Sequence, residues 1–368
     1  MKTNHVLFFA VLITCGLFAQ QASAKIWRVN SNSNYNGTSL WGDNFGGTST
    51  YPVFAQLANA NSSNLVSSGD TLYVEGSTIA YDNVTFTKKL VIIGPGYFLT
   101  ENPKVSNDVL SANVGEVVFN TGSQGSQLLG VTIISVYGID INVSNILIKR
   151  CKIDYSVTVT YNISDISIVQ NYFTNINNNN TSAIAVSPYG FPTNFVFNNN
   201  ISKRTLLLAY STTTYTAQEC NHNVFDCPAI SGKPSIQLNT GSFKNNILKT
   251  PTATVNINGG SNQNISYNIS ASSTGQFGTA NNNKVVTDMS TLFVTGTSDG
   301  KYKLKTNSPG SHNASDGTDR GVFGGTSSTD RYTLSGLAPI PVIYTFTTSG
   351  DATPANGLSV TISAKTVK

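Results

Sequence analysis

The sequence predicts an all-β solenoid, a coil of short strands, from its composition and from an internal repeat. Only 11% of the 368 residues are charged, against about 25% in ordinary soluble domains. Their place is taken largely by 43 Asn and 31 Gly, which together with Ser and Thr weaken helix interiors. The 18 Phe and 16 Tyr supply a core and argue against disorder.

The repeat lies between residues 125 and 285 and has a period of about 22 residues. Each unit alternates apolar and polar residues for three positions, skips two, and then places an anchor residue that is usually Asn. Ile166-Ser167-Ile168 followed by Asn171 is the clearest copy. The anchors are Gly130, Cys151, Asn171, Asn200, Asn223, Asn246 and Asn268.

This pattern has a direct structural interpretation. Alternation with a period of two indicates strands with one buried face. A unit of this length fits a coil of three short strands, and successive coils stack about 4.8 Å apart. Asn suits the anchor because it tolerates the left-handed turn conformation and because its amide can bond to the amides of neighbouring coils. Gly130 meets the same conformational demand, whereas Cys151 should interrupt the ladder.

The N-terminal part of the chain divides into two segments. Residues 1–24 are typical of a secretory signal peptide, with Lys2 at the start, an apolar centre and a small-residue cleavage site at Ala22-Ser23-Ala24. Residues 25–65 should cap the first coil, with a short helix over residues 52–64, because an exposed sheet edge promotes aggregation. No later stretch has the apolar length of a transmembrane helix.

The following motifs carry a family resemblance. The Asn-anchored coils, the opening unit over residues 68–76, the next rung over residues 90–96, and the segments Ser308-Pro309-Gly310 and Asp316 to Gly324 resemble right-handed parallel β-helix proteins of the pectin-lyase-like superfamily, of an exported bacterial type. The resemblance covers roughly residues 65–325. It implies a right-handed β-helix over residues 66–334 and leaves residues 335–368 as a small C-terminal β tail.

Two groups of residues are candidates for carbohydrate chemistry. The 29-residue spacing between Asn171 and Asn200 implies a loop that contains Tyr189 and Phe191. These rings either form a platform for stacking sugars or cover the adjacent core. Three positions after successive anchors stand Lys203, Asp226 and Lys249, which stacking would make vertical neighbours. They form either an exposed charge ladder or an acid and base on a sugar-binding face.

The remaining candidates concern metal, nucleic acid and disulfides. Asp316 and Asp319 are weak candidates for a Ca²⁺ site, with turn capping as the alternative. His222 should point outward in a turn. The net charge of +4 is scattered, which disfavours a nucleic-acid partner. Cys151, Cys220 and Cys227 remain after cleavage of the signal; buried thiols are favoured over a Cys220–Cys227 bridge.

We therefore expect a secreted or surface-exposed β-helix protein, with the periplasm as the alternative compartment, that binds a glycan or acts as a surface scaffold. The alternative function is a polysaccharide lyase or glycoside hydrolase that acts on an acidic polysaccharide. Enzymes of these classes use several carboxylates or a basic residue with Ca²⁺, and few charged residues fall on the coils. Fold alone cannot decide between these functions.

Overall fold

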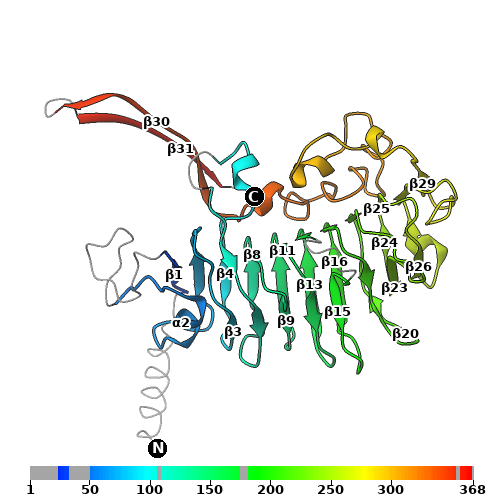
Figure 1. The fold of residues 1–368 in the computed structure, drawn as a ribbon, viewed down its shortest axis with the longest axis horizontal. Coiled ribbons are helices and arrows are strands. Elements are labelled where there is room, and N and C mark those ends of the chain that lie inside the picture. The colour runs from blue at the N-terminus through cyan, green and yellow to red at the C-terminus, as the bar shows by residue number, and fades with distance from the viewer. Residues whose placement is uncertain (1–23, 33–49, 106–108, 175–180, 354–356, 367–368) are drawn as a thin grey trace, which may run out of the picture.

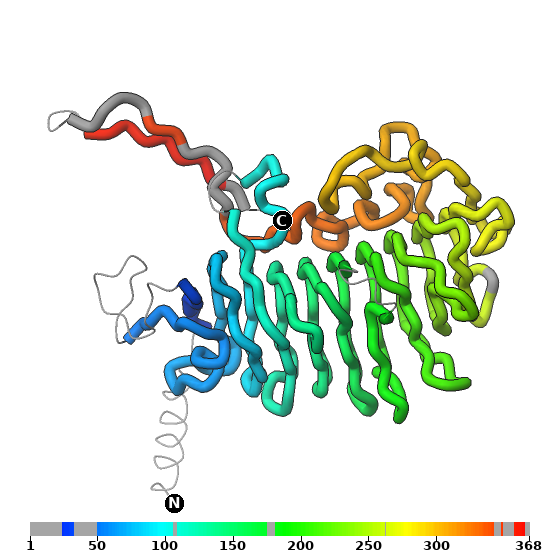
Figure 2. The backbone as a smooth tube through the Cα atoms, viewed as in Figure 1, coloured from blue at the N-terminus to red at the C-terminus, as the bar shows by residue number. Residues whose placement is uncertain are grey.

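A computed structural model describes residues 24–32, 50–105, 109–174, 181–353 and 357–366. The predicted signal peptide, apart from Ala24, lies outside these ranges. The described chain is nearly all-β and forms a parallel β-helix (Figure 1). Its coils stand in one row from the N-terminal to the C-terminal end (Figure 2).

Three long parallel sheets run along the row of coils. The first contains β1 (Ile26–Val29), β2 (Thr71–Val74), β4 (Val91–Ile93), β7 (Gln127–Leu129), β10 (Ile146–Lys149), β13 (Ser164–Val169) and β16 (Thr193–Asn198). The second contains β5 (Asn113–Val114), β8 (Thr132–Ile133), β11 (Lys152–Ile153), β14 (Tyr172–Phe173), β17 (Ile201–Ser202), β22 (Val224–Phe225), β25 (Ile247–Leu248), β28 (Ile269–Ser270) and β29 (Lys284–Val285). The third contains β3 (Val84–Phe86), β6 (Val117–Phe119), β9 (Ile139–Ile141), β12 (Val157–Val159) and β15 (Ile184–Val186).

Shorter strands complete the later coils. A parallel sheet joins β18 (Leu206–Leu207), β21 (Thr216–Ala217), β23 (Ile236–Thr240) and β26 (Val255–Asn258), and a parallel pair joins β24 (Phe243–Lys244) and β27 (Ile265–Ser266). An antiparallel pair, β19 (Ala209–Tyr210) and β20 (Thr213–Thr214), extends one turn. Short 3-10 turns lie at Leu99–Glu101, Asn262–Asn264, Met289–Thr291, Asp299–Tyr302 and Leu334–Gly336.

The interior of the coils is the main core. Alternate residues of each strand point inward, as in β10, where Ile146 and Ile148 are buried and their neighbours are half-buried. Residues that pair between coils can stack: Phe86 of β3 pairs with Phe119 of β6, and their rings lie 5.5 Å apart at 27°. Rings from different sheets also meet across the core, since those of Phe197 and Phe225 lie 6.5 Å apart at 14° and those of Phe225 and Phe243 lie 6.3 Å apart at 8°.

The N-terminal cap contributes a strand and a helix. β1 pairs with β2 and so forms the edge of the first sheet. Beyond it, Phe54 bridges Val29, and helix α2 (Leu57–Ser62) buries Leu57 and Ala60 against the first coils. The predicted helix is therefore present but short.

After β29 the chain turns back. Residues 286–337, here called the return segment, run along one side of the coils toward β4 (Figure 1). The segment forms a second core with the outward side chains of the second sheet, and the members of that core include Tyr172, Ile201, Val224, Ile247, Leu292, Phe293, Tyr302, Val322 and Tyr332. The sequence motif Asp316 to Gly324 lies in this segment.

The C-terminal tail is a β-hairpin of β30 (Pro341–Thr353) and β31 (Gly357–Thr366). It projects away from the coils (Figures 1 and 2). Leu358, Val360 and Ile362 of β31 are exposed.

Candidate functional site

The amides of the anchor residues form a continuous buried ladder. Asn171, Asn200, Asn223 and Asn246 each donate through Nδ2 to the carboxamide oxygen of the next anchor, at 3.0–3.3 Å. Each anchor's backbone N–H bonds to the same oxygen. The ladder ends at Asn283, which receives both bonds from Asn268. Because every amide in it is paired with others of the chain, the ladder is structural.

The left-handed conformation does not fall on the anchors. It falls on the residue before each one: Gln170 has φ +59°, Asn199 +53° and His222 +54°. Gly130, with φ +67°, matches these residues, because Leu129 pairs with Lys149 and so aligns Gly130 with Arg150. The expected place of Gly130 in the anchor column was therefore wrong by one residue. Cys151 stands in the column and donates its backbone N–H to Asn171.

Tyr189 and Phe191 have different roles. Phe191 packs against the core, with its ring 4.8 Å from that of Phe195 and stacked at 5.6 Å on Tyr215. Tyr189 is 78% exposed, and its ring lies 5.4 Å from that of Tyr161, which is 43% exposed. The structure therefore gives one exposed aromatic pair, Tyr161 and Tyr189, in place of the expected pair.

This tyrosine pair lies on the turns between the third and first sheets. Tyr161 follows β12 and Tyr189 follows β15, and these strands are neighbours. Gly190 has φ +149°, and a Cβ atom there would lie only 3.1 Å from the Cβ of Tyr161. Glycine thus allows the loop of Tyr189 to approach the turn of Tyr161.

Lys203, Asp226 and Lys249 lie on successive coils, as their spacing predicts. The backbone N–H of Asp226 bonds to Ser202 and that of Lys249 to Phe225. The ammonium group of Lys249 lies 3.0 Å from Oδ2 of Asp226, with both side chains less than a quarter exposed. The return segment adds Tyr302, whose hydroxyl donates to the same oxygen at 2.7 Å.

These contacts determine the protonation of Asp226. Burial acts to raise the pKa of its carboxyl, but the charge of Lys249 and the bond from Tyr302 outweigh burial and hold the pKa below its ordinary value. The carboxylate is therefore ionised at neutral pH, and its Oδ2 already accepts from Lys249 and Tyr302, which does not suit a general acid.

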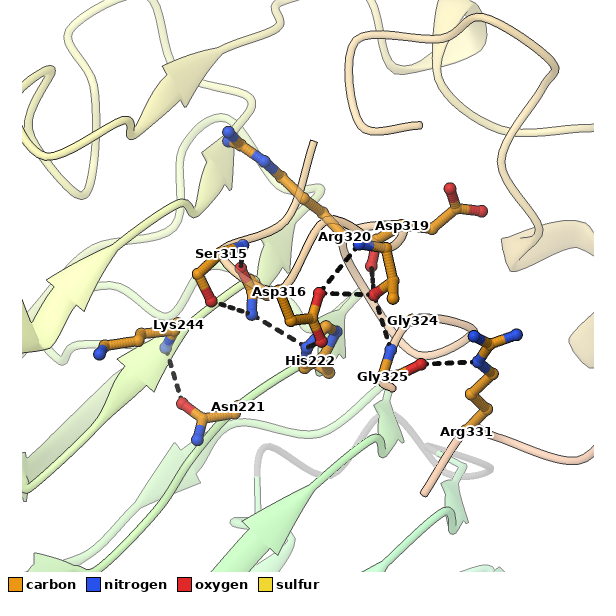
Figure 3. Close-up of polar contacts among 12 residues, drawn as sticks. Asn221, His222, Lys244, Ser315, Asp316, Asp319, Arg320, Gly324, Gly325 and Arg331 are labelled. Carbon is orange, nitrogen blue, oxygen red and sulfur yellow. Dashed lines mark hydrogen bonds and ion pairs between the residues drawn. The ribbon is translucent and has the colours of Figure 1, made fainter. Parts of the chain in front are cut away.

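His222 is buried beneath the return segment, with 8% of its surface exposed, so the expectation that it points into solvent was wrong. Its Nδ1 lies 3.3 Å from the carbonyl oxygen of Gly321, and its Nε2 lies 2.9 Å from Nδ2 of Asn245. Asp316 approaches the same Nε2 at 3.3 Å (Figure 3). Burial lowers the pKa of His222 and outweighs the opposite effect of Asp316. The ring fastens the return segment to the coils.

Asp316 and Asp319 do not share a site. The Asp316 carboxylate accepts bonds from the N–H and hydroxyl of Thr318, whereas that of Asp319 points away from His222 (Figure 3) and accepts the N–H of His312. In the described ranges no three His, Cys, Asp or Glu residues gather as a metal site would need. Since Ca²⁺ takes about six to eight oxygen ligands, this pair does not fit a calcium ion.

The three described cysteines are free and buried. Cys220 and Cys227 do not form a bridge, and burial raises the pKa of Cys151 and of Cys227 to about 12 each. Thiols of this kind are inert.

Four contributors were missed in the sequence: Asn283, Lys301, Tyr302 and Tyr161, the partner of Tyr189. Asn283 follows Asn268 by only 15 residues, so a search at the repeat period passes over it, although Val285 two positions later matches the unit. Lys301 and Tyr302 lie in the return segment, which carries no repeat. No pattern in the sequence indicates that this segment turns back onto the second sheet.

In the comparisons with known proteins, no family model, no curated protein and no solved structure matches this chain. Among the residues that the structure describes, no helix has the length and apolar character needed to cross a membrane.

Proposed function

We propose that the protein is a secreted or surface-exposed β-helix scaffold, of the pectin-lyase-like type, that binds a glycan at the exposed pair Tyr161 and Tyr189. The exposure of Tyr189 is the observation that carries the proposal. A ring that is 78% exposed contributes little to the core. An aromatic face held open on a rigid turn is suited to stack on the apolar face of a sugar ring.

The neighbourhood of the pair supports this function. The pair sits on turns of adjacent coils, so the spacing of its backbone is fixed by the hydrogen bonds between β12 and β15, and little backbone freedom is lost on binding. Phe191 anchors the same loop to the core.

An enzymatic role finds less support. Among the described residues, the column of Lys203, Asp226 and Lys249 contributes one carboxylate, and that carboxylate already accepts bonds from Lys249 and Tyr302. Hydrolases need two carboxylates placed about the scissile bond. The alternative function of a lyase or hydrolase is therefore tested in the same experiment, described next.

The test is titration calorimetry against a panel of neutral and uronate-containing polysaccharides, with new chain ends recorded in parallel. Tyr189→Ala and Tyr161→Ala should each weaken binding about fivefold to tenfold, because an aromatic stacking contact contributes about 1 kcal/mol. Tyr137→Ala is the matched control, since Tyr137 is 67% exposed on a turn between the second and third sheets.

Unchanged binding in both variants, or no binding to any glycan, would contradict the proposal. New reducing or unsaturated chain ends that disappear in Asp226→Asn would favour the enzyme.

A further inference from the structure

We propose that Lys203, Lys249 and Lys301 form a second site, which binds an acidic group, a carboxylate or a sulfate ester, carried by a glycan. The inference rests on the proposed glycan-binding function and adds the class of glycan. We call these three residues with Asp226 the lysine cluster.

The backbone places the first part of the lysine cluster on one edge of the coils. The backbone N–H of Asp226 donates at 2.8 Å to the carbonyl oxygen of Ser202, the residue before Lys203. The backbone N–H of Lys249 donates at 2.9 Å to the carbonyl oxygen of Phe225, the residue before Asp226. The three residues therefore leave the second sheet at the same point of successive coils, about 4.8 Å apart. Their order is cation, anion, cation.

The return segment supplies the third cation. Lys301 directly precedes Tyr302. The ammonium nitrogen of Lys249 lies 5.0 Å from the centroid of the Tyr302 ring, and the ammonium nitrogen of Lys301 lies 5.2 Å from it. The Tyr302 hydroxyl bonds to Asp226. Tyr302 thus brings two ammonium groups and the carboxylate together.

The charges of the lysine cluster do not balance. Asp226 forms an ion pair with Lys249, whereas Lys203 and Lys301 form none with any residue that the structure describes. Three cations face one anion where all four side chains are partly buried. Burial lowers the pKa of Lys301; the charge of Asp226 partly offsets this, while Lys203 and Lys249 lower the pKa further.

A bound anion would relieve this imbalance. Each ammonium group offers up to three donors, and charge-assisted bonds to carboxylate or sulfate oxygens are stronger than neutral ones. A like-charged Asp226 would compete with such a ligand. Replacing its charge should therefore strengthen binding, opposite to the effect expected for a catalytic residue.

The experiment compares dextran sulfate with uncharged dextran, and adds polygalacturonate and inorganic sulfate as further probes. Dextran sulfate or polygalacturonate should bind the wild type, and Lys203→Met and Lys301→Met should each weaken binding about tenfold, the effect of losing one charge-assisted bond. Lys305→Met is the control, because Lys305 is exposed on the same segment. Asp226→Asn should tighten binding, and melting temperatures check that each variant is folded.

The outcomes separate this inference from the proposed function. Loss of acidic-glycan binding in the two Lys variants, with neutral-glycan binding unchanged, supports the inference. Equal effects of Lys305→Met and Lys203→Met, inorganic sulfate binding as tightly as the polymers, or no binding of any anionic probe would each overturn it. Failure of the tyrosine site would appear separately, as unchanged neutral-glycan binding in the Tyr161 and Tyr189 variants.

Discussion

The carboxamide oxygen of Asn223 accepts two hydrogen bonds from Asn200, one from its backbone N–H at 2.8 Å and one from its Nδ2 at 3.3 Å. The Nδ2 of Asn223 in turn donates to Phe197 and to Asn246. One side chain therefore satisfies polar groups on three coils. Buried polar groups that lose such partners cannot form replacement hydrogen bonds with water.

Replacing Asn223 by Ala should lower the free energy of unfolding by about 3 kcal/mol, because it leaves several buried polar groups without partners. Chemical denaturation followed by far-ultraviolet circular dichroism measures the change. The matched control is Asn256→Ala on β26, since Asn256 is exposed and its side chain makes no hydrogen bond within the described chain. Equal losses in the two variants would show that the ladder contributes nothing specific.

Cys151 is the position where the ladder can be extended. Its backbone already donates to Asn171 at 2.9 Å, and its sulfur lies 3.5 Å from the carbonyl oxygen of Leu128. Leu128 pairs with Ile148 of the next coil, and the carbonyl oxygen of Ile148 accepts a hydrogen bond from Nδ2 of Asn171. The carbonyl oxygen of Leu128 is therefore the matching acceptor for an Asn at position 151. Cys151→Asn should therefore keep or raise stability, by up to about 1 kcal/mol.

Cys151→Ala is the comparison for this substitution, and it should destabilise by about 1 kcal/mol through the lost packing of the sulfur. Thermal unfolding of both variants measures the order. A Cys151→Asn variant less stable than Cys151→Ala would show that an amide does not fit at this coil.

Much of the fold follows from the sequence because the repeat determines it. Alternation within each unit fixed which residues point inward, and the 23-residue spacing of the later anchors placed Asn223 over Asn200 and Asp226 beside Lys249. The N-terminal helix was predicted over a longer range than α2 occupies, since Val53 and Phe54, which belong to the apolar spacing, are buried outside the helix, where Phe54 forms a β-bridge with Val29.

The sites follow less well because they depend on contacts outside the repeat. Tyr161 becomes a partner of Tyr189 only through the geometry of two turns, and Lys301 reaches Asp226 only because the return segment folds back. His222 was expected in solvent for the same reason: its own coil leaves it outside, and residues almost a hundred positions later cover it. Non-local packing of this kind leaves no periodic signal.

His222 should make stability depend on pH. Its folded pKa is lowered by burial, so the unfolded chain binds a proton more readily than the folded one. The contribution of His222 to the free energy of unfolding is fully present above its pKa in the unfolded chain, about 6.5, and is lost as pH falls through its pKa in the folded protein. Wild-type stability should therefore fall below about pH 6.5 more steeply than that of His222→Gln.

Urea midpoints between pH 5 and 8 measure the difference, and His312→Gln is the control because the His312 side chain is 85% exposed. Parallel pH profiles for the wild type and His222→Gln would exclude this role.

Asp299 should show the opposite dependence. It lies fully buried in the return segment, where its Oδ2 accepts the hydroxyl of Tyr332 at 3.0 Å and the N–H of Ser335 at 2.6 Å. Tyr97, which bonds to Tyr332, completes the surroundings. Burial raises the pKa of Asp299 despite these donors. The contribution of Asp299 to the free energy of unfolding is therefore complete below its pKa in the unfolded chain and is lost as pH rises through its pKa in the folded protein.

Asp299→Asn removes this ionisation while it keeps an oxygen for both donors. The stability of this variant relative to the wild type should therefore increase from about pH 3.5 to pH 7. Asp288→Asn tests the sign, because Asp288 is exposed, accepts the N–H of Ser290 and has a lowered pKa; its stability relative to the wild type should decrease over the same range. Two profiles with the same slope would show that the burial of Asp299 does not control its ionisation.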